Sequence, residues 1–386
     1  MAVMVADRAS CYTPPALLIG PRSCPMVDWF GVVRPILHRL DPERAHGVSL
    51  CALAAGLVPA QPADQDPALR TQLFGHPVPN PIGLAGGFDK NARVFHRMFD
   101  QGFGFVEVGG VTPRPQPGNP KPRLFRLAED AAVINRMGFN NDGAAAIAAR
   151  LVARPQPGRL LGVNLASNSD SADPAADFVQ LVERFARLVD FLVIDVSCPN
   201  TRNGRVFQDP VALEDLLARL RAVHAAQGAR SALVAKLAPD LGAAELEAIV
   251  GVIAQARLAG LIIGNTTVAR PASLRSRDRN EAGGLSGRPL FDLSTDLLRT
   301  VYRLTAGRLT LIGTGGISSG AEAYAKIRAG ASAVQLYSAL VYRGPALVTE
   351  IKRDLAHRLR ADGFSAVAEA VGADHRDITR APSAAA

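Results

Sequence analysis

The sequence predicts an α/β fold, a (β/α)8 TIM barrel with an N-terminal two-helix extension. Eight short apolar runs alternate with stretches of helical hydrophobic spacing, which is the pattern of parallel strands connected by helices. Most of the runs are continuous rather than alternating, as expected for strands that are buried on both faces. A doubly wound sheet is the runner-up, but such a sheet more often stops at about six strands.

The composition is that of a large folded domain. The chain has 386 residues, of which 48% are hydrophobic and 20% are charged, and these proportions argue against disorder. The net charge of +8 would suit nucleic acid, anionic lipid or an anionic substrate, but no dense basic block with interleaved aromatic residues points to nucleic acid. The four cysteines form no C-x-x-C pair, so we expect neither a disulfide framework nor a metal site. The expected location is the reducing cytoplasm.

The first 60 residues divide into a leader and an extension. Residues 1–25 lack a basic region followed by an apolar core, so we do not expect a signal peptide. We expect either a disordered leader or a true start at Met26. Residues 26–60 predict two helices, because apolar side chains recur on one face as far as Leu40 and Asp41 with Pro42 begins a second helix. These helices are either packing elements or a surface that enters the membrane interface.

The barrel is expected over residues 68–360, and a C-terminal tail over 361–386. Its strands are assigned to the apolar runs at 81–88, 103–111, 160–167, 191–197, 232–239, 258–266, 309–317 and 332–340. Helices are predicted between them, among others at 175–189, 211–226 and 243–259. Residues 69–80 predict a hairpin beneath the barrel, and the insertion at 112–141 predicts another above it. Long loops on the carboxyl side of barrel strands commonly carry the chemistry.

Polar residues stand at strand ends, where an apolar core would not place them. The first strand ends at Lys90, the third carries Asn164 and the fifth carries Lys236. A lysine in a buried strand is costly unless its ammonium group meets an anion or reaches solvent. The fourth strand leads into Cys198, which is either a catalytic group at the strand mouth or a small hydrophobic residue.

Loops of small residues follow the last strands. GTGGIS at 313–318 supplies glycines ahead of a helix, Tyr337 and Ser338 follow the eighth strand, and GGLSG at 283–287 forms a third such segment. Backbone N–H groups approach a phosphate closely at glycine, and barrels commonly hold phosphates after strands 7 and 8. The set predicts a phosphorylated cofactor with a lysine near its ring.

Several long motifs resemble the dihydroorotate dehydrogenase family, and the two N-terminal helices resemble its membrane-associated, quinone-dependent class (class 2). The motifs are FDK at 88–90, VTPRPQPGNPKPRLFRL at 111–127, INRMGFNN at 134–141, APDL at 238–241, NTT at 265–267, GGLSGRPL at 283–290 and GASAVQLYSAL at 330–340. The resemblance implies an FMN-containing barrel that oxidises (S)-dihydroorotate to orotate in de novo pyrimidine (UMP) biosynthesis. The electrons then pass to a quinone through a tunnel under the N-terminal helices.

The resemblance also assigns the site residues. Cys198 is expected to be the general base that removes the C5 proton while hydride leaves C6 for flavin N5. Substrate contacts are expected from Lys90, Asn135, Asp195, Asn200, Asn265 and Thr266. Flavin contacts are expected from Ala85, Gly86, Lys90, Gly110, Asn164, Asp195, Lys236, Gly264, Gly287, Gly315, Gly316, Tyr337 and Ser338. His46 and Arg126 are expected to line the quinone tunnel.

The chain departs from the family pattern within this site. The quinone-dependent class usually has Ser where this chain has Cys198, and a thiol with an ordinary pKa of about 8.5 becomes a competent base beside a cation. Asp195 stands where the family has Asn, and an ionised Asp would repel the carboxylate of dihydroorotate. Residues 166–169 read Ala-Ser-Asn-Ser in place of Gly-Lys-Asn-Lys, and Gly86 and Gly110 replace Ala and a hydroxyl residue.

Three functions are therefore open. The first is a quinone-dependent dihydroorotate dehydrogenase, monomeric and held peripherally on the cytoplasmic side of the inner membrane, with dihydroorotate, orotate and quinone as partners and no nucleic acid. The second is a divergent flavin oxidoreductase that acts on another dihydropyrimidine. The third is a degenerate, non-catalytic FMN barrel that serves as a partner protein.

Overall fold

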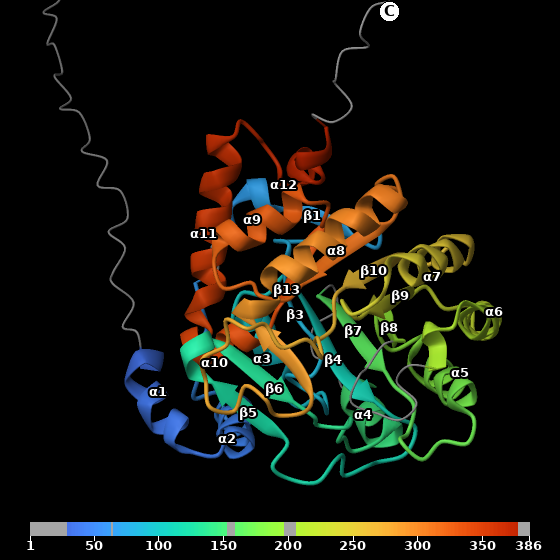
Figure 1. Cartoon of the computed structure of the whole chain (residues 1–386), viewed down its shortest axis with the longest axis horizontal. Coiled ribbons are helices and arrows are strands. Elements are labelled where there is room, and N and C mark those ends of the chain that lie inside the picture. Colours follow the sequence, from blue (N-terminus) through green and yellow to red (C-terminus); the bar gives the residue numbers. More distant parts are fainter. Residues whose placement is uncertain (1–28, 63–64, 153–158, 197–205, 377–386) are drawn as a thin grey trace, which may run out of the picture.

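The computed structural model describes residues 29–62, 65–152, 159–196 and 206–376. Eight parallel strands close into a barrel in the order β10-β12-β13-β3-β4-β7-β8-β9 (Figure 1). They are β3 (Ile82–Leu84), β4 (Phe105–Val111), β7 (Leu160–Leu165), β8 (Phe191–Asp195), β9 (Ala232–Leu237), β10 (Gly260–Ile263), β12 (Thr310–Thr314) and β13 (Ala333–Leu336). Each strand lies within one of the eight apolar runs, so the predicted (β/α)8 barrel is confirmed.

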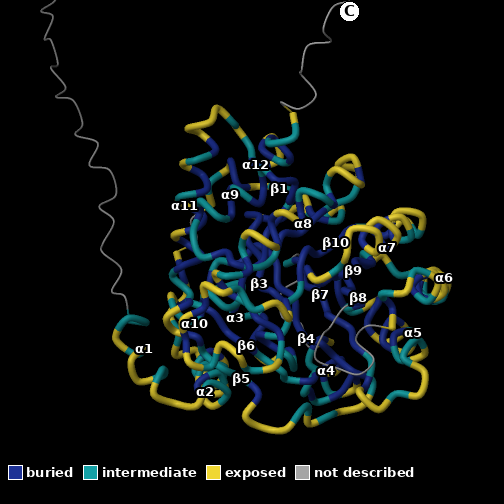
Figure 2. Tube along the Cα trace, viewed as in Figure 1, coloured by how far each residue is buried: buried dark blue, intermediate teal, exposed yellow. Residues whose placement is uncertain are grey.

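Helices surround the barrel and follow its strands in turn. They are α3 (Phe95–Asp100), α4 (Ala144–Val152), α5 (Pro174–Phe185), α6 (Pro210–Ala226), α7 (Ala243–Gln255), α8 (Phe291–Leu304), α9 (Gly320–Arg328), the short α10 (Ser338–Arg343) and α11 (Ala346–Ala361). Figure 2 shows the strands buried between these helices, whose outer faces are exposed. Such two-sided burial is the physical reason that the strand sequences are continuously apolar.

Two of these helices, and one in the extension, begin at an Asp-Pro pair. Asp173 accepts a hydrogen bond from the Ala176 backbone N–H at the start of α5, and Asp209 accepts one from Ala212 at the start of α6. An Asp side chain satisfies N–H groups that have no partner within the helix, and proline suits the first turn, where no N–H is needed. These local signals make the helix starts readable from the sequence.

A hairpin closes the amino end of the barrel. Strands β1 (Thr71–Leu73) and β2 (His76–Val78) pair antiparallel. Leu73 and Val78 of the hairpin join Phe105 and Phe191 from the barrel strands in one buried apolar cluster. The hairpin predicted beneath the barrel is therefore confirmed.

A small sheet stands above the carboxyl ends of the strands. β5 (Leu124–Leu127) and β6 (Ala132–Asn135) form the predicted hairpin, and β11 (Gly284–Gly287) pairs antiparallel with β6. The segment GGLSG is thus a strand of this sheet, which corrects its interpretation as a loop. Its partner strand lies about 150 residues earlier in the chain, so no local pattern reveals the pairing.

The N-terminal extension lies against the small sheet and α10. It consists of α1 (Trp29–Arg39) and α2 (Pro42–Ala54), with Asp41 capping α2 as predicted. In Figure 1, α2 lies beside β5, whereas α1 contacts α10 and α2. No residue of α1 is buried, and Val32 and Ile36 are 72% and 62% exposed. No helix in the described part of the chain is long and apolar enough to cross a membrane.

The chain continues to pack on the barrel after α11. Residues 367–370 form α12 (Val367–Ala370), in which Val367 and Ala370 are wholly buried, and a turn at Ala373–His375 follows. The His375 ring contacts the Ala329 carbonyl oxygen at 3.1 Å, next to the end of α9. Residues 362–376 are therefore part of the packed domain, although the sequence suggested a tail from 361 onward.

Candidate active site

One cavity of about 730 Å³ runs from the carboxyl ends of the barrel strands to α1 and α2. Every site residue expected from the sequence that falls within the described residues lines this cavity: His46, Ala85, Gly86, Lys90, Gly110, Arg126, Asn135, Asn164, Asp195, Lys236, Gly264, Asn265, Thr266, Gly287, Gly315, Gly316, Tyr337 and Ser338. Cys198 and Asn200 lie outside the described residues. Segments as far apart in the chain as His46 and Ser338 therefore meet in one space, at the end of the barrel where such folds carry their chemistry.

A polar layer inside the barrel forms the floor of this cavity. Glu107 of β4 is fully buried, and its Oε1 accepts hydrogen bonds from Asn164 Nδ2 at 2.8 Å and Lys236 Nζ at 3.5 Å. Its Oε2 accepts from Gln335 Nε2 at 2.7 Å. Gly86 makes room for the carboxylate, because a Cβ at that position would lie 2.4 Å from Glu107 Oε1.

Sequence reasoning missed Glu107 and Gln335. The available signal was a charged residue in the apolar run FVEVGGV, every residue of which is buried. A carboxylate in such a strand requires donors from other strands. Lys236 was recognised by the same argument, and the structure shows that the anion it meets is Glu107.

A second polar cluster lies at the ends of β8 and β10. Asn265 Nδ2 donates to both carboxylate oxygens of Asp195, at 3.1 and 3.3 Å. Asn265 Oδ1 accepts from the Thr266 backbone N–H at 2.8 Å. These contacts fix the orientation of the Asn265 amide, since its oxygen and its nitrogen each have a defined partner. Asp195 thus has a structural partner at the very position where the family pattern has Asn.

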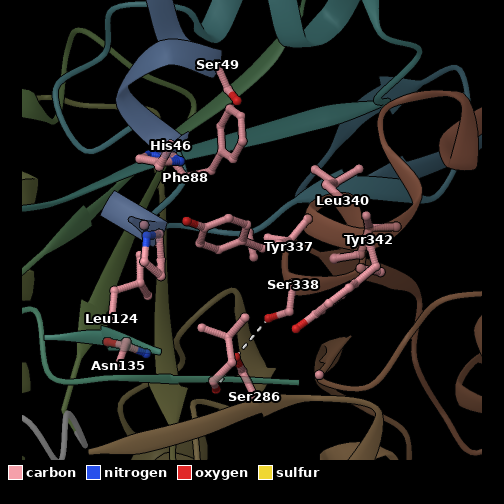
Figure 3. A pocket seen from close by; sticks show the side chains of 18 of the residues that line it. His46, Ser49, Phe88, Leu124, Asn135, Ser286, Tyr337, Ser338, Leu340 and Tyr342 are labelled. Atoms are coloured by element: carbon pink, nitrogen blue, oxygen red, sulfur yellow. Dashed lines mark hydrogen bonds between the residues drawn. The ribbon is translucent and has the colours of Figure 1, made fainter. Parts of the chain in front are cut away.

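The loop after β12 has a conformation that only glycine tolerates. Gly315 and Gly316 have φ angles of +102° and +78°, and a Cβ on Gly316 would lie 2.5 Å from the Phe291 Cα. Across the cavity, Ser338 Oγ donates to Ser286 Oγ at 2.8 Å, as Figure 3 shows. Proteins commonly bind phosphate where backbone N–H groups can approach it closely and hydroxyl groups lie nearby.

Unsatisfied polar atoms mark the place of a ligand between these regions. Asn164 Oδ1 and Thr266 Oγ1 are buried and have no hydrogen-bond partner among the described residues. Buried polar atoms in native proteins are nearly always paired, so a ligand with polar edges is expected there. Because two lysines and the glycine loop line the same cavity, it suits a planar heterocycle that carries a phosphate.

Lys90 lies at the wall of the cavity, just after β3. Its Nζ donates to the Gly87 carbonyl oxygen at 2.6 Å. Burial lowers the pKa of Lys90 to about 8, with the Glu43 carboxylate opposing that shift. The side chain is therefore a cation at neutral pH and loses its charge in the mildly alkaline range.

Three rings pack together where the cavity passes from the barrel to the extension. The ring centroids of His46 and Phe88 are 5.3 Å apart, and those of Phe88 and Tyr337 are 5.5 Å apart; Figure 3 shows the three side chains. Burial and the nearby charge of Lys90 lower the pKa of His46 to about 4. The imidazole is thus neutral near pH 7, and its Nε2 donates to the Phe88 carbonyl oxygen at 3.0 Å.

Two arginines fasten the extension to the small sheet. Arg126 of β5 donates to the carbonyl oxygens of Leu37 and His38 at 3.0 Å each, and also to that of Leu40. It therefore caps the end of α1 while it lines the cavity, a structural task that the sequence did not indicate. Arg123 binds Glu43 of α2 through two contacts of 2.7 and 3.1 Å, and this pairing lowers the pKa of Glu43.

Known proteins resemble this chain over nearly its whole length. The family model described as dihydroorotate dehydrogenase matches residues 68–359. A protein of Rhodospirillum rubrum named dihydroorotate dehydrogenase (quinone) is 55% identical over 354 residues, which cover 91% of this chain and 96% of that protein. A protein of the same name from Azorhizobium caulinodans is 52% identical over 356 residues, 91% of this chain and all of that protein.

Solved structures show the same likeness. The crystal structure of ligand-free DHODH from Eimeria tenella has a TM-score of 0.83 and 41% identity, and it covers 87% of this chain and 100% of that chain. The structure of DHODH from the same organism in complex with ferulenol has a TM-score of 0.83 and 40% identity, with 87% and 96% covered.

Proposed function

The chain belongs to the dihydroorotate dehydrogenase family, whose members are flavin-dependent oxidoreductases, and we propose that it oxidises (S)-dihydroorotate to orotate with a quinone as electron acceptor. This reaction serves de novo pyrimidine biosynthesis. The observation that carries the proposal is one continuous cavity that joins the polar strand ends to the N-terminal helices. One space can then admit the substrate at the barrel and the acceptor at the extension.

We propose FMN as the flavin. The open acceptor atoms of Asn164 and Thr266 suit the donor groups of a flavin ring and ribityl chain, and the loop at Gly315 and Gly316 suits the phosphate. When bound, FMN supplies the redox chemistry by accepting a hydride from the substrate and passing the electrons to the quinone. Lys236 contributes a cation near the ring, which favours the electron-rich form of the cofactor.

We assign substrate binding to a set of polar residues that line the cavity, namely Lys90, Asn135, Asn265 and Thr266. Lys90 supplies a cation at neutral pH for the carboxylate of dihydroorotate. Asn135, Asn265 and Thr266 line the same cavity and offer the donors and acceptors that a pyrimidine ring needs. Asn200 is proposed as a further contact from its motif, although it lies outside the described residues.

Cys198 is proposed as the general base. Its place directly after β8 in the sequence and the resemblance of its motif support this role, while the residue itself lies outside the described residues. Cys198→Ala should retain FMN and lose proton abstraction, whereas Cys198→Ser should keep some activity, because a hydroxyl can take over the proton transfer. Full activity of Cys198→Ala would exclude this residue as the base.

The quinone is proposed to bind between the extension and the barrel. The cavity there is lined by apolar side chains of α1 and α2, namely Trp29, Phe30, Val33, Ile36, Leu37, Val48, Ala52 and Leu53. An apolar pocket with a few polar groups, here His46 and Arg126, suits such a ligand. We further propose that the chain is a monomer held peripherally on the cytoplasmic side of the inner membrane. The exposed Val32 and Ile36 support contact of α1 with a membrane surface.

The decisive experiment is an anaerobic reduction of the bound flavin. The purified protein should be yellow, and its flavin absorbance should bleach rapidly when dihydroorotate is added. Bleaching by an uncharged dihydropyrimidine and not by dihydroorotate would assign the alternative substrate class, which the carboxylate of Asp195 in the cavity favours. A flavin that neither compound reduces, or a protein that binds no FMN, would contradict the proposal and favour a degenerate barrel.

The acceptor is tested separately. Removal of residues 1–60 should abolish turnover with quinone and leave the reduction of the flavin by substrate intact, because the cavity wall contributed by α1 and α2 would be lost. Unchanged quinone turnover after this deletion would show that the extension does not form the acceptor site.

A further inference from the structure

We propose that Glu107 is a positioning residue that fixes Lys236 and Asn164 at the floor of the flavin cavity and thereby sets the reduction potential of the bound flavin. The proposal rests on the binding of FMN proposed above. Glu107 itself does not line the cavity, whereas Lys236, Asn164 and Gln335 do. Its effect on a ligand therefore passes through these neighbours.

The contacts come from strands on different sides of the barrel. Glu107 stands on β4, Asn164 on the adjacent β7, Lys236 on β9 and Gln335 on β13. All four side chains are buried, with Glu107 at 0% and Lys236 at 6% exposure. Three donors reach one carboxylate, at 2.8, 3.5 and 2.7 Å. A buried carboxylate that accepts from three donors is satisfied, and it holds each donor in place.

The first consequence concerns the orientation of Asn164. Its Nδ2 donates to Glu107, so its Oδ1 is the atom that remains, and that atom is buried with no partner among the described residues. An amide has one donor side and one acceptor side. Glu107 thus decides that Asn164 presents an acceptor to the ligand, and the ligand must offer an N–H or O–H group there.

The second consequence concerns the charge of Lys236. Reduction adds negative charge to a flavin, and a nearby cation stabilises the reduced form. A carboxylate 3.5 Å from the lysine Nζ offsets much of the positive potential that the lysine exerts, because opposite charges interact strongly in a buried environment. Glu107 is therefore expected to keep the reduction potential lower than Lys236 alone would set it.

Glu107→Gln isolates this charge, because the amide has nearly the same shape. The hydrogen bonds around the new amide can rearrange. The Gln335 amide can turn over so that its oxygen accepts from the new side chain and its nitrogen donates to Thr314 Oγ1, which now lies 3.1 Å from Gln335 Oε1. The Thr314 hydroxyl can donate or accept equally well. The variant should still bind FMN. We expect its oxidised-to-reduced ratio at a fixed potential to change at least tenfold toward the reduced form, which for a two-electron couple is a rise of about 30 mV.

Two further variants separate the positioning role from a general loss of charge. Lys236→Met should lower the reduction potential of the flavin. Glu107→Gln should then change the potential clearly less in the Lys236→Met background than it does in the wild type. Asp190→Asn is the matched control, because it also replaces a hydrogen-bonded carboxylate of the barrel. Asp190 accepts the Leu161 backbone N–H at 2.8 Å and lies at the amino end of the strands. The potential of this variant should equal that of the wild type. An unchanged potential in Glu107→Gln, or fully additive effects with Lys236→Met, would overturn the proposal.

The failure of FMN binding is distinguishable from the failure of this inference. If the wild type binds no FMN, the proposed function fails, and the pairing is then judged from unfolding. Glu107→Gln removes the Glu107 charge from beside the buried Lys236 ammonium, so it should unfold at a lower temperature than the wild type. The double variant with Lys236→Met should recover part of that loss. A single variant as stable as the wild type would refute the pairing itself.

Discussion

The glycine loop after β12 gives a prediction that the structure allows us to work out in detail. Gly316→Ala adds one methyl group at a residue with φ of +78°, which costs an L-residue about 1–2 kcal/mol. The methyl would lie 2.5 Å from the Cα and Cβ of Phe291. An ordinary contact begins near 3.4 Å, so the separation must grow by 3.4 − 2.5, or about 0.9 Å.

The neighbouring helix cannot easily provide that space. Phe291 is the first residue of α8, whose Leu298 and Val301 are wholly buried against the barrel. Overpacking of this kind typically costs about 1–3 kcal/mol. With the backbone strain, the free energy of unfolding should fall by about 2–5 kcal/mol. If the loop moves instead of α8, FMN should bind about tenfold to hundredfold more weakly, which corresponds to about 1.4–2.8 kcal/mol.

The assay combines chemical denaturation with titration of the apoprotein by FMN, followed by flavin fluorescence. Gly251→Ala is the matched control, because Gly251 lies within α7, is exposed and has nothing within 4 Å of an added Cβ. The same substitution there should stabilise the protein by about 0.5–1 kcal/mol. A Gly316→Ala protein with wild-type stability and wild-type FMN affinity would refute both the rigidity of the loop and its role in phosphate binding.

Three further predictions concern charged residues. Orotate should bind with constant affinity below about pH 8 and more weakly above it, because Lys90, whose pKa burial lowers to about 8, loses its charge there; equilibrium titrations should show no such inflection in Lys90→Met. Arg126→Leu removes the donors to the last carbonyl groups of α1, so the KM for quinone should rise while anaerobic flavin reduction keeps its rate, and equal effects on both steps would contradict this. Glu43→Gln should lower the free energy of unfolding by about 2 kcal/mol, since Arg123 loses its charged partner. The pKa of Glu43 is lowered in the folded state. The stability difference between wild type and variant should therefore be complete above the ordinary pKa of the carboxyl group and vanish as the pH falls through the lowered pKa. A stability difference that persists in acid would show that the ion pair is not its source.

The barrel was predictable because its signals are local. A strand buried on both faces must be apolar throughout. An Asp-Pro pair marks the start of a helix in the sequence, as Asp209 with Pro210 does for α6. The hairpin over β1 and β2 also forms between neighbouring segments. The polar strand ends followed from the same logic, since a residue such as Lys236 in an apolar run is anomalous wherever the strand lies in the fold.

The partners of those residues were decided only by the tertiary structure. Glu107 and Lys236 are separated by 129 residues, and Arg126 reaches carbonyl groups 86 to 89 residues earlier in the chain. The position of β11 beside β6 is likewise set by the closure of the barrel. The sequence by itself determined which segments form the eight barrel strands and that Lys236 is out of place in one of them, because burial acts on each segment alone. The closure of eight strands into one barrel decides which of these residues meet and which atom of each faces the cavity. No single segment of the sequence contains that information.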